Sequence, residues 1–286
     1  MSTRVRDTLG GALDNLRYEP TDKRIRAILD GAIAVDTTRA VLLWEPRRIV
    51  PSYAVPESDV RADLSDGAAA DGAGDVDGVS VPALSERPVL DPSVPFAAHT
   101  ADGRAVDVRV GEAQRAGAGF RLADADLSGY LVLDFGAFDG WYEEDEPNVG
   151  HPRDPFHRID VLASSRHVVV EHEGELLAES SRPTVLFETM LPPRYYLPRE
   201  DVRVELVPSD TRSYCAYKGQ ASYWSPRLGG EVLDDLAWSY EDPLHDAEQV
   251  RGRIAFFNER VDLVVDGERG DRPQTPWSTR ASASRS

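Results

Sequence analysis

The sequence predicts a mainly β fold built from two β-rich modules with rolled, barrel-like sheets. Three observations indicate it: short runs of β-branched and aromatic residues recur, 20 prolines interrupt them, and one pattern occurs twice. Such runs, several of them alternating with polar residues, are typical of strands. Frequent proline disfavours long helices because proline lacks a backbone N–H. We therefore expect helix only at 5–16 and, as a turn or two, at 246–250.

The expected strands follow one another along the chain: "RIRAILDG", "AVLLWE", "VRVELV", "RIAFF" and "VDLVV". Turn-forming stretches such as "EPRR", "LPPR" and "EDP" separate them. Between residues 65 and 93, an Ala-, Gly- and Asp-rich stretch has too few apolar residues to bury and is expected to be irregular. The tail at 269–286 is expected to be disordered.

An internal repeat predicts the domain organisation. "DGAIAVDTTRAVLLWE" (Asp30–Glu45) aligns without a gap with "EGELLAESSRPTVLFE" (Glu173–Glu188). "YAVPESDVRADL" (Tyr53–Leu64) likewise aligns with "YYLPREDVRVEL" (Tyr195–Leu206). Repeats of this kind indicate one structural unit used twice. We expect an N-terminal extension at 1–23, a first module at 24–160 with an insertion at about 65–93, and a second module at 161–268.

Composition narrows the classes of partner. With 50 acidic and 32 basic side chains, the formal net charge is −18, which disfavours nucleic acid and anionic membrane as partners. The acidity fits a GC-rich genome or a salt-adapted host. A single cysteine excludes an intramolecular disulfide. No run reaches the ~18 apolar residues of a membrane span, and the N-terminus lacks the apolar centre of a signal peptide. A cytoplasmic protein is therefore predicted.

The stretch "SYCAYKGQASYW" (Ser213–Trp224) holds the only cysteine, Cys215, and one of two lysines, Lys218. A nearby ammonium favours the thiolate, which is the reactive form of cysteine. Lysine can lose its proton when buried, so the pKa of Lys218 is expected to be lowered. Positions three apart point to opposite faces of a regular strand, and Gly219 would relieve this by allowing a bulge or turn. The alternative is an inert, buried cysteine beside a solvent-facing lysine.

The second module resembles the family named domain of unknown function 427. Six motifs carry the resemblance in order: "EGELLAES", "VLFE", "YYLPREDV", "TRSYCAYKGQASYW", "LAWSYEDP" and "GRIAFFNERVDL". The resemblance implies a small β-rich module of the β-tent class, which includes Mss4-like proteins, and no established activity. The first module lacks a counterpart of the Cys-Ala-Tyr-Lys-Gly run. It is expected to be a degenerate copy without a site of its own.

The predicted site lies in the second module. Cys215, Lys218 and Glu188 are the catalytic candidates. Glu188 ends the apolar run "TVLFE" and is either a general base, a partner for Lys218 or a structural carboxylate. The candidate ligand-binding residues are aromatic, and the alternative for them is an ordinary core role: Tyr196, Tyr217, Tyr223, Trp238 and Tyr240. Tyr217 and Trp238 are expected to roof a pocket shared by Cys215 and Lys218.

No cofactor or metal is expected. One cysteine cannot supply the paired Cys-x-x-Cys ligands of zinc-binding relatives, and the six histidines are scattered. No phosphate-binding loop and no G-x-S-x-G motif occurs. Nucleotidyltransferases, with which the family is sometimes grouped, use a Gly-Ser pair that this chain lacks.

Two functions stay open. The first is a small-molecule pocket, with Cys215 as nucleophile or Lys218 as acid, base or Schiff-base former. The second is a non-catalytic interaction module that presents its aromatic face to a partner. The ligand and the oligomeric state, including a homo-oligomer, are left open by the sequence.

Overall fold

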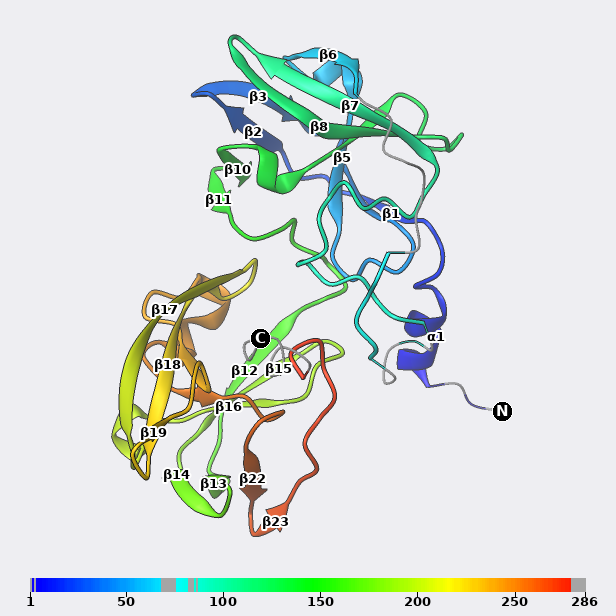
Figure 1. Cartoon of the computed structure of the whole chain (residues 1–286). Helices are drawn as coiled ribbons and strands as arrows, with labels where there is room; N and C mark the ends of the chain where they lie inside the picture. The colour runs from blue at the N-terminus through cyan, green and yellow to red at the C-terminus, as the bar shows by residue number, and fades with distance from the viewer. Residues whose placement is uncertain (1, 3, 68–75, 82–84, 86, 279–286) are drawn as a thin grey trace. The chain divides into compact units, whose positions relative to one another are not determined.

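The computed structural model divides the chain into two compact units, Met1–Asp154 and Pro155–Ser286 (Figure 1). It describes residues 2, 4–67, 76–81, 85 and 87–278. The division falls between residues 154 and 155, where the sequence predicts 160 and 161. Within the described ranges, no helix is long and apolar enough to cross a membrane.

The first unit contains the α-helix α1 (Val5–Gly11), shorter than the predicted helix, and two antiparallel sheets. One sheet has the strand order β1 (Arg17–Pro20), β4 (Val41–Trp44), β5 (Ser52–Pro56), β9 (Tyr130–Leu133), β8 (Ala113–Leu122), β7 (Gly103–Val110) and β6 (Asp63–Asp66). The other has the order β11 (Glu146–Asn148), β10 (Gly140–Glu143), β2 (Ile25–Leu29) and β3 (Ala32–Thr37). Short 3-10 turns lie at η1 (Glu57–Asp59) and η2 (Phe135–Ala137). Alternating burial along β2 places Ile25, Ala27 and Leu29 in the core.

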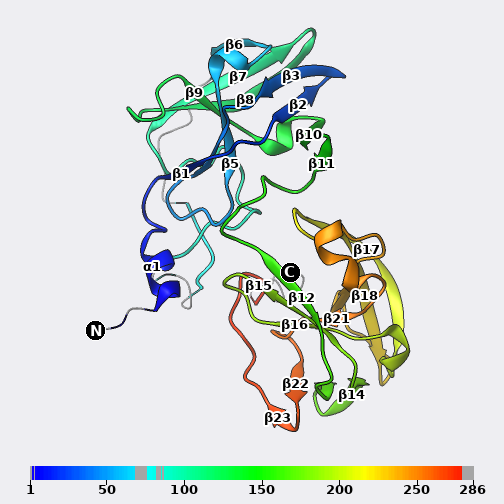
Figure 2. The ribbon, with the colours of Figure 1, turned by 180° about the vertical axis from the view of Figure 1, so that it is seen from behind.

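The second unit, shown from behind in Figure 2, contains three antiparallel sheets. The first sheet has the strand order β12 (Ile159–Ala163), β15 (Thr184–Glu188) and β16 (Arg194–Tyr196). The second has the order β14 (Glu175–Ser180), β13 (Val168–His172), β22 (Asp262–Val265) and β23 (Glu268–Arg269). The third has the order β17 (Glu205–Cys215), β18 (Gly219–Leu228), β20 (Ala237–Ser239) and β21 (Ala255–Phe256). Strand β19 (Glu231–Val232) pairs with β18. The 3-10 turns η3 (Arg199–Asp201) and η4 (His245–Val250) complete the unit, and η4 covers the helical turn predicted at 246–250.

The two units share a strand order. The sheet β11-β10-β2-β3 of the first corresponds along the chain to β23-β22-β13-β14 of the second. Both central hairpins carry a register shift in their first strand and turn through two residues of positive φ, Asp30-Gly31 and Glu173-Gly174. Two positive φ angles are typical of a type I′ hairpin turn, and glycine adopts them without strain. The two aligned segments therefore form hairpins with the same turn geometry, each within a four-stranded sheet of the same strand order.

The expectation of barrel-like sheets needs correction. Each sheet is an open path, so the described residues form no closed barrel. Most of the described residues in the stretch at 65–93 lie outside strands and helices, and within it Val79 pairs with buried Val89. Residues 68–75, 82–84 and 86 lie outside the described residues. The predicted tail is described through residue 278, and in it buried Thr275 donates a hydrogen bond to Glu259. Residues 279–286 are not described.

Candidate functional site

A tight hairpin turn carries the rare cysteine and lysine. Strands β17 and β18 pair so that Cys215 lies opposite Gly219, which leaves Ala216, Tyr217 and Lys218 as the turn. Gly219 has a φ of +90°, a conformation in which a side chain is strained. The Lys218 carbonyl accepts a hydrogen bond from the Leu244 backbone N–H at 3.1 Å. The turn is packed into the unit: Tyr217 is 1% exposed and Lys218 is 8% exposed.

Lys218 forms a buried ion pair with Glu188. Its Nζ donates to Glu188 Oε2 at 2.5 Å, and both side chains are about nine-tenths buried. Glu188 Oε1 lies 3.1 Å from Nε2 of His157. Strand β12, which pairs Ile159 with Glu188, brings this histidine into place. Cation and carboxylate thus share a region of low dielectric, where neither is stable alone.

The ion pair fixes the protonation of both partners. Burial alone would raise the pKa of Glu188, but Lys218 and His157 lower it to about 2. Burial alone would lower the pKa of Lys218, but Cys215, Glu188 and Tyr196 raise it above the ordinary lysine value. The expectation of a lowered Lys218 pKa is therefore wrong, because Cys215, Glu188 and Tyr196 together outweigh desolvation. Both groups are charged at neutral pH.

Cys215 is close to this pair. It is partly exposed, and it interacts electrostatically with Lys218 and with Tyr240. The structure therefore brings together the three predicted catalytic candidates, Cys215, Lys218 and Glu188. The only thiol of the chain thus lies beside a buried ammonium.

Two of the predicted aromatic residues, Tyr196 and Tyr240, interact electrostatically with the ion pair. Tyr196 OH accepts a hydrogen bond from Trp238 Nε1 at 3.1 Å, and its ring lies 6.4 Å from that of Tyr240. Burial raises the pKa of Tyr196 to about 12. Tyr223 stacks on Phe257 and exchanges a 2.9 Å hydrogen bond with Ser213. These residues belong to one apolar cluster of the second unit.

The two aromatics expected to form a roof have different neighbours. Tyr217 stacks on the His157 ring at 5.6 Å, with the Arg158 guanidinium 5.6 Å from its centroid. Trp238 packs against Phe257 at 4.5 Å between centroids. Both are buried in the walls of the unit. Tyr217 is thus the aromatic residue that covers the histidine side of the ion pair.

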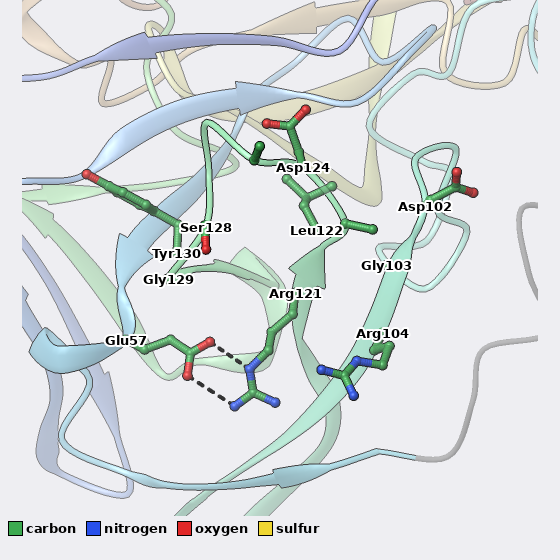
Figure 3. A pocket seen from close by; sticks show the side chains of 12 residues that line it. Glu57, Asp102, Gly103, Arg104, Arg121, Leu122, Asp124, Ser128, Gly129 and Tyr130 are labelled. Carbon is green, nitrogen blue, oxygen red and sulfur yellow. Dashed lines mark hydrogen bonds and ion pairs between the residues drawn. The ribbon is translucent and has the colours of Figure 1, made fainter.

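Two concavities lie away from the predicted residues. One, in the first unit, has a volume of about 660 Å³, and its Arg121 is already paired with Glu57 through bonds of 2.6 and 3.1 Å (Figure 3). The other, in the second unit, has a volume of about 290 Å³ and is lined by Arg166, Tyr195 and Asn258 among others. Neither includes Cys215, Lys218 or Glu188, so the candidate site is a compact cluster beside a partly exposed thiol.

Sequence reasoning missed His157. The histidine occurs in the Pro-rich stretch "HPRDPFHRID", outside every motif used to define the second module. Its signal is its place two residues before a strand that pairs with the strand of Glu188. Without that pairing, the sequence separation of 31 residues gives no indication of contact.

The equivalent carboxylate of the first unit is held differently. Glu45 Oε1 lies 2.9 Å from Nδ1 of buried His99, and its Oε2 accepts hydrogen bonds from the backbone N–H groups of Thr100 and Ala101. His99 stacks on Phe120 at 3.5 Å. Burial raises the pKa of Glu45, but His99 and the two N–H groups lower it overall. Both carboxylate oxygens of Glu45 thus have hydrogen-bond partners within the first unit.

One protein-family model matches the part of the chain that contains the candidate site. Residues 160–267 match the family model NTP_transf_9, described as Domain of unknown function (DUF427). The second unit therefore resembles this family over the whole span from β12 to β22. The match contains Glu188, Cys215 and Lys218, whereas His157 lies just before it. No curated protein matches the chain.

Proposed function

We propose that the second unit binds a small electrophilic molecule and that Cys215 is the nucleophile. The observation that carries the proposal is the buried Lys218–Glu188 ion pair beside the only thiol of the chain. A neighbouring ammonium stabilises a thiolate, which is the nucleophilic form of cysteine. The aromatic residues around the pair supply the apolar wall of such a site.

The charge states assign the remaining roles. A lysine whose pKa is raised stays protonated, so Lys218 is neither a general base nor a Schiff-base former at neutral pH. A carboxyl whose pKa is about 2 stays ionised, so Glu188 is not a proton donor. Lys218 therefore acts as an electrostatic partner of Cys215, and Glu188 is its positioning residue.

The test is the rate of Cys215 alkylation by iodoacetamide as a function of pH. We expect Lys218→Met to move the rise in labelling rate to higher pH, because the thiolate loses its neighbouring cation. The matched control is Lys23→Met, which removes the other lysine of the chain and should leave the profile unchanged. Superimposable profiles for the parent and Lys218→Met would contradict the proposal and favour a non-catalytic interaction module.

We also propose that the two units are tandem copies of one module of the β-tent class, and that the first copy has lost the Cys-Lys turn. The shared strand order and the matched positive-φ hairpin turns support this. The saturated Glu45 supports the loss, because His99 and two backbone N–H groups take the place of a lysine partner.

A further inference from the structure

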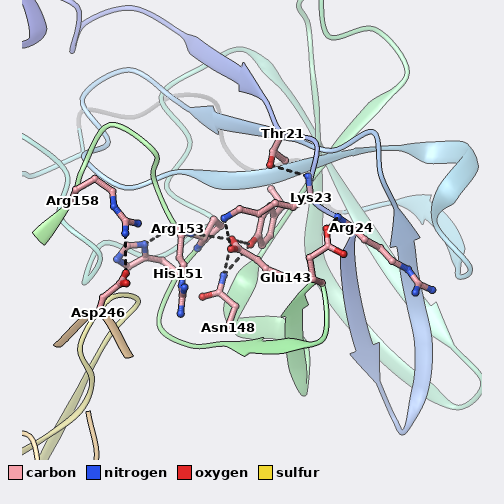
Figure 4. A network of polar contacts seen from close by, with 12 residues as sticks. Thr21, Lys23, Arg24, Glu143, Asn148, His151, Arg153, Arg158 and Asp246 are labelled. Carbon is pink, nitrogen blue, oxygen red and sulfur yellow. Dashed lines mark hydrogen bonds and ion pairs between the residues drawn. The ribbon is translucent and has the colours of Figure 1, made fainter. Parts of the chain in front are cut away.

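A second cluster of buried polar groups lies in the first unit, at the ends of β10 and β11 (Figure 4). Glu143, at the end of β10, accepts a 2.5 Å hydrogen bond from Lys23 Nζ on Oε2 and a 2.6 Å bond from Tyr53 OH on Oε1. Asn148, at the end of β11, donates its Nδ2 to Tyr53 OH at 2.9 Å. Tyr53, Glu143 and Asn148 are buried, whereas the Lys23 side chain is 46% exposed.

One acceptor of this cluster is unused. Among the described residues, Asn148 Oδ1 is buried without a hydrogen-bond partner, and Asn148 as a whole is 6% exposed. Flipping the amide does not repair this, because Tyr53 OH has one proton and gives it to Glu143. A buried acceptor without a donor is costly, so this position is suited to a ligand or a water that brings an N–H or O–H group.

The residues of this cluster have counterparts in the second unit. By strand register, Tyr53, Glu143 and Asn148 correspond to Tyr195, Val265 and Gly270. In the second unit these three residues line the concavity of about 290 Å³. In the first unit, a carboxylate and an amide stand where the second has valine and glycine. The three positions thus border a concavity in the second unit and hold a cluster of buried polar side chains in the first.

The chemistry of this first-unit cluster suits a cation. Its acceptors are the Glu143 carboxylate and the free Asn148 oxygen, and its wall is aromatic, with the Tyr53 and Trp141 rings 5.0 Å apart. Carboxylate, amide oxygen and ring faces all attract ammonium groups. Lys23 already places an ammonium on Glu143, from a half-exposed and flexible stem. A free amine of similar size can therefore replace it.

We propose that the first unit binds the primary ammonium group of a small amine at Glu143, Asn148 and Tyr53, with Lys23 as the internal occupant that the amine displaces. The site differs in place and chemistry from the Cys215 site and does not depend on it. The first unit therefore has a ligand-binding site of its own, although it lacks the Cys-Lys turn.

The test is a titration of the full chain with n-butylammonium, followed through the NMR signal of the Trp141 indole N–H, which donates to the Phe135 carbonyl. We expect Lys23→Ala to bind at least tenfold more tightly than the parent, because the competing ammonium is gone. In the Lys23→Ala background, Asn148→Ala should weaken binding about tenfold and Glu143→Gln should abolish it. Arg166→Ala, at the position of Lys23 in the second unit, is the matched control and should change nothing.

The neutral probe n-butanol separates ammonium recognition from apolar filling. The proposal requires n-butanol to bind at least tenfold more weakly than n-butylammonium to Lys23→Ala. Equal binding of the two probes, no binding to Lys23→Ala, or unchanged binding in both Glu143→Gln and Asn148→Ala would each overturn it. In the second of these cases, the free Asn148 oxygen holds a water. Circular dichroism of each variant confirms that the comparison is made between folded proteins.

Discussion

At the scale of single residues, the two lysines share one arrangement. Lys218 and Lys23 each donate from Nζ to a buried glutamate at 2.5 Å, in a chain whose other basic side chains besides histidine are arginine. A compact ammonium fits one carboxylate oxygen in a confined space, whereas the planar guanidinium needs room for several donors. The hypothesis that Cys215 and Lys218 form a site followed from the rarity of cysteine and lysine in this chain. The contact between Lys218 and Glu188 could be predicted as one of several alternatives, but the raised pKa of Lys218 could not, because it depends on Cys215, Glu188 and Tyr196 together.

The low pKa of Glu188 predicts a pH dependence of stability. Its folded-state pKa of about 2 lies below the ordinary 4.5, so its stabilising effect is complete above pH 4.5 and is lost as the pH falls toward 2. At pH 3 the loss from this group is about 2 kcal/mol. We therefore expect the difference in unfolding free energy between the parent and Glu188→Gln to narrow by about that amount between pH 6 and pH 3.

Urea denaturation at the two pH values measures this difference. The exposed Glu175→Gln serves as the control and should follow the parent at both. If the difference in unfolding free energy between the parent and Glu188→Gln stays constant, the pKa of Glu188 is not lowered by the ion pair with Lys218.

At the scale of elements, the turn between β17 and β18 decides where the site lies. The sequence predicts a turn or bulge near Gly219, and the structure places the turn at residues 216–218. The inward packing of this turn could not be predicted, because it depends on Leu244, which lies in a segment without strand signals. The same holds for His157, which β12 brings to Glu188.

The turn geometry predicts a difference between two glycines. Gly219 and Gly230 have φ values of +90° and +92°, so alanine at either position should cost about 1–2 kcal/mol of stability. Only at Gly219 would the new Cβ contact the Leu244 side chain and backbone, at 3.4 Å, whereas nothing lies within 4 Å at Gly230. We expect both variants to be destabilised, but only Gly219→Ala to change the rate at which iodoacetamide labels Cys215. Equal labelling rates in the two variants would show that the conformation of this turn does not control the reactivity of Cys215.

At the scale of the whole molecule, the mainly β fold could be predicted because strand signals are local. Alternation such as that of Ile25, Ala27 and Leu29 is visible in the sequence and survives in the structure. The shared strand order follows from the aligned motifs around Gly31 and Gly174. The other features of the structure could not be predicted, because they depend on contacts between segments that are distant in the sequence. Thr275 looks like part of a polar tail, yet it is buried because Glu259, paired with Arg194, needs a further donor.

The two units predict two unfolding transitions. Each has its own apolar core: Ile25, Leu131 and Trp141 belong to the first, and Val168, Leu177 and Ile254 to the second. Chains with separate cores depart from two-state unfolding. Lys218→Met leaves the buried Glu188 without its ammonium partner, with only His157 beside it, and should destabilise the second unit by about 3–5 kcal/mol. Differential scanning calorimetry should therefore show one transition moved to lower temperature and the other unchanged. Lys23→Met should affect the opposite transition, and less strongly, because Lys23 is half exposed. A single transition that moves in both variants would show that the units unfold as one.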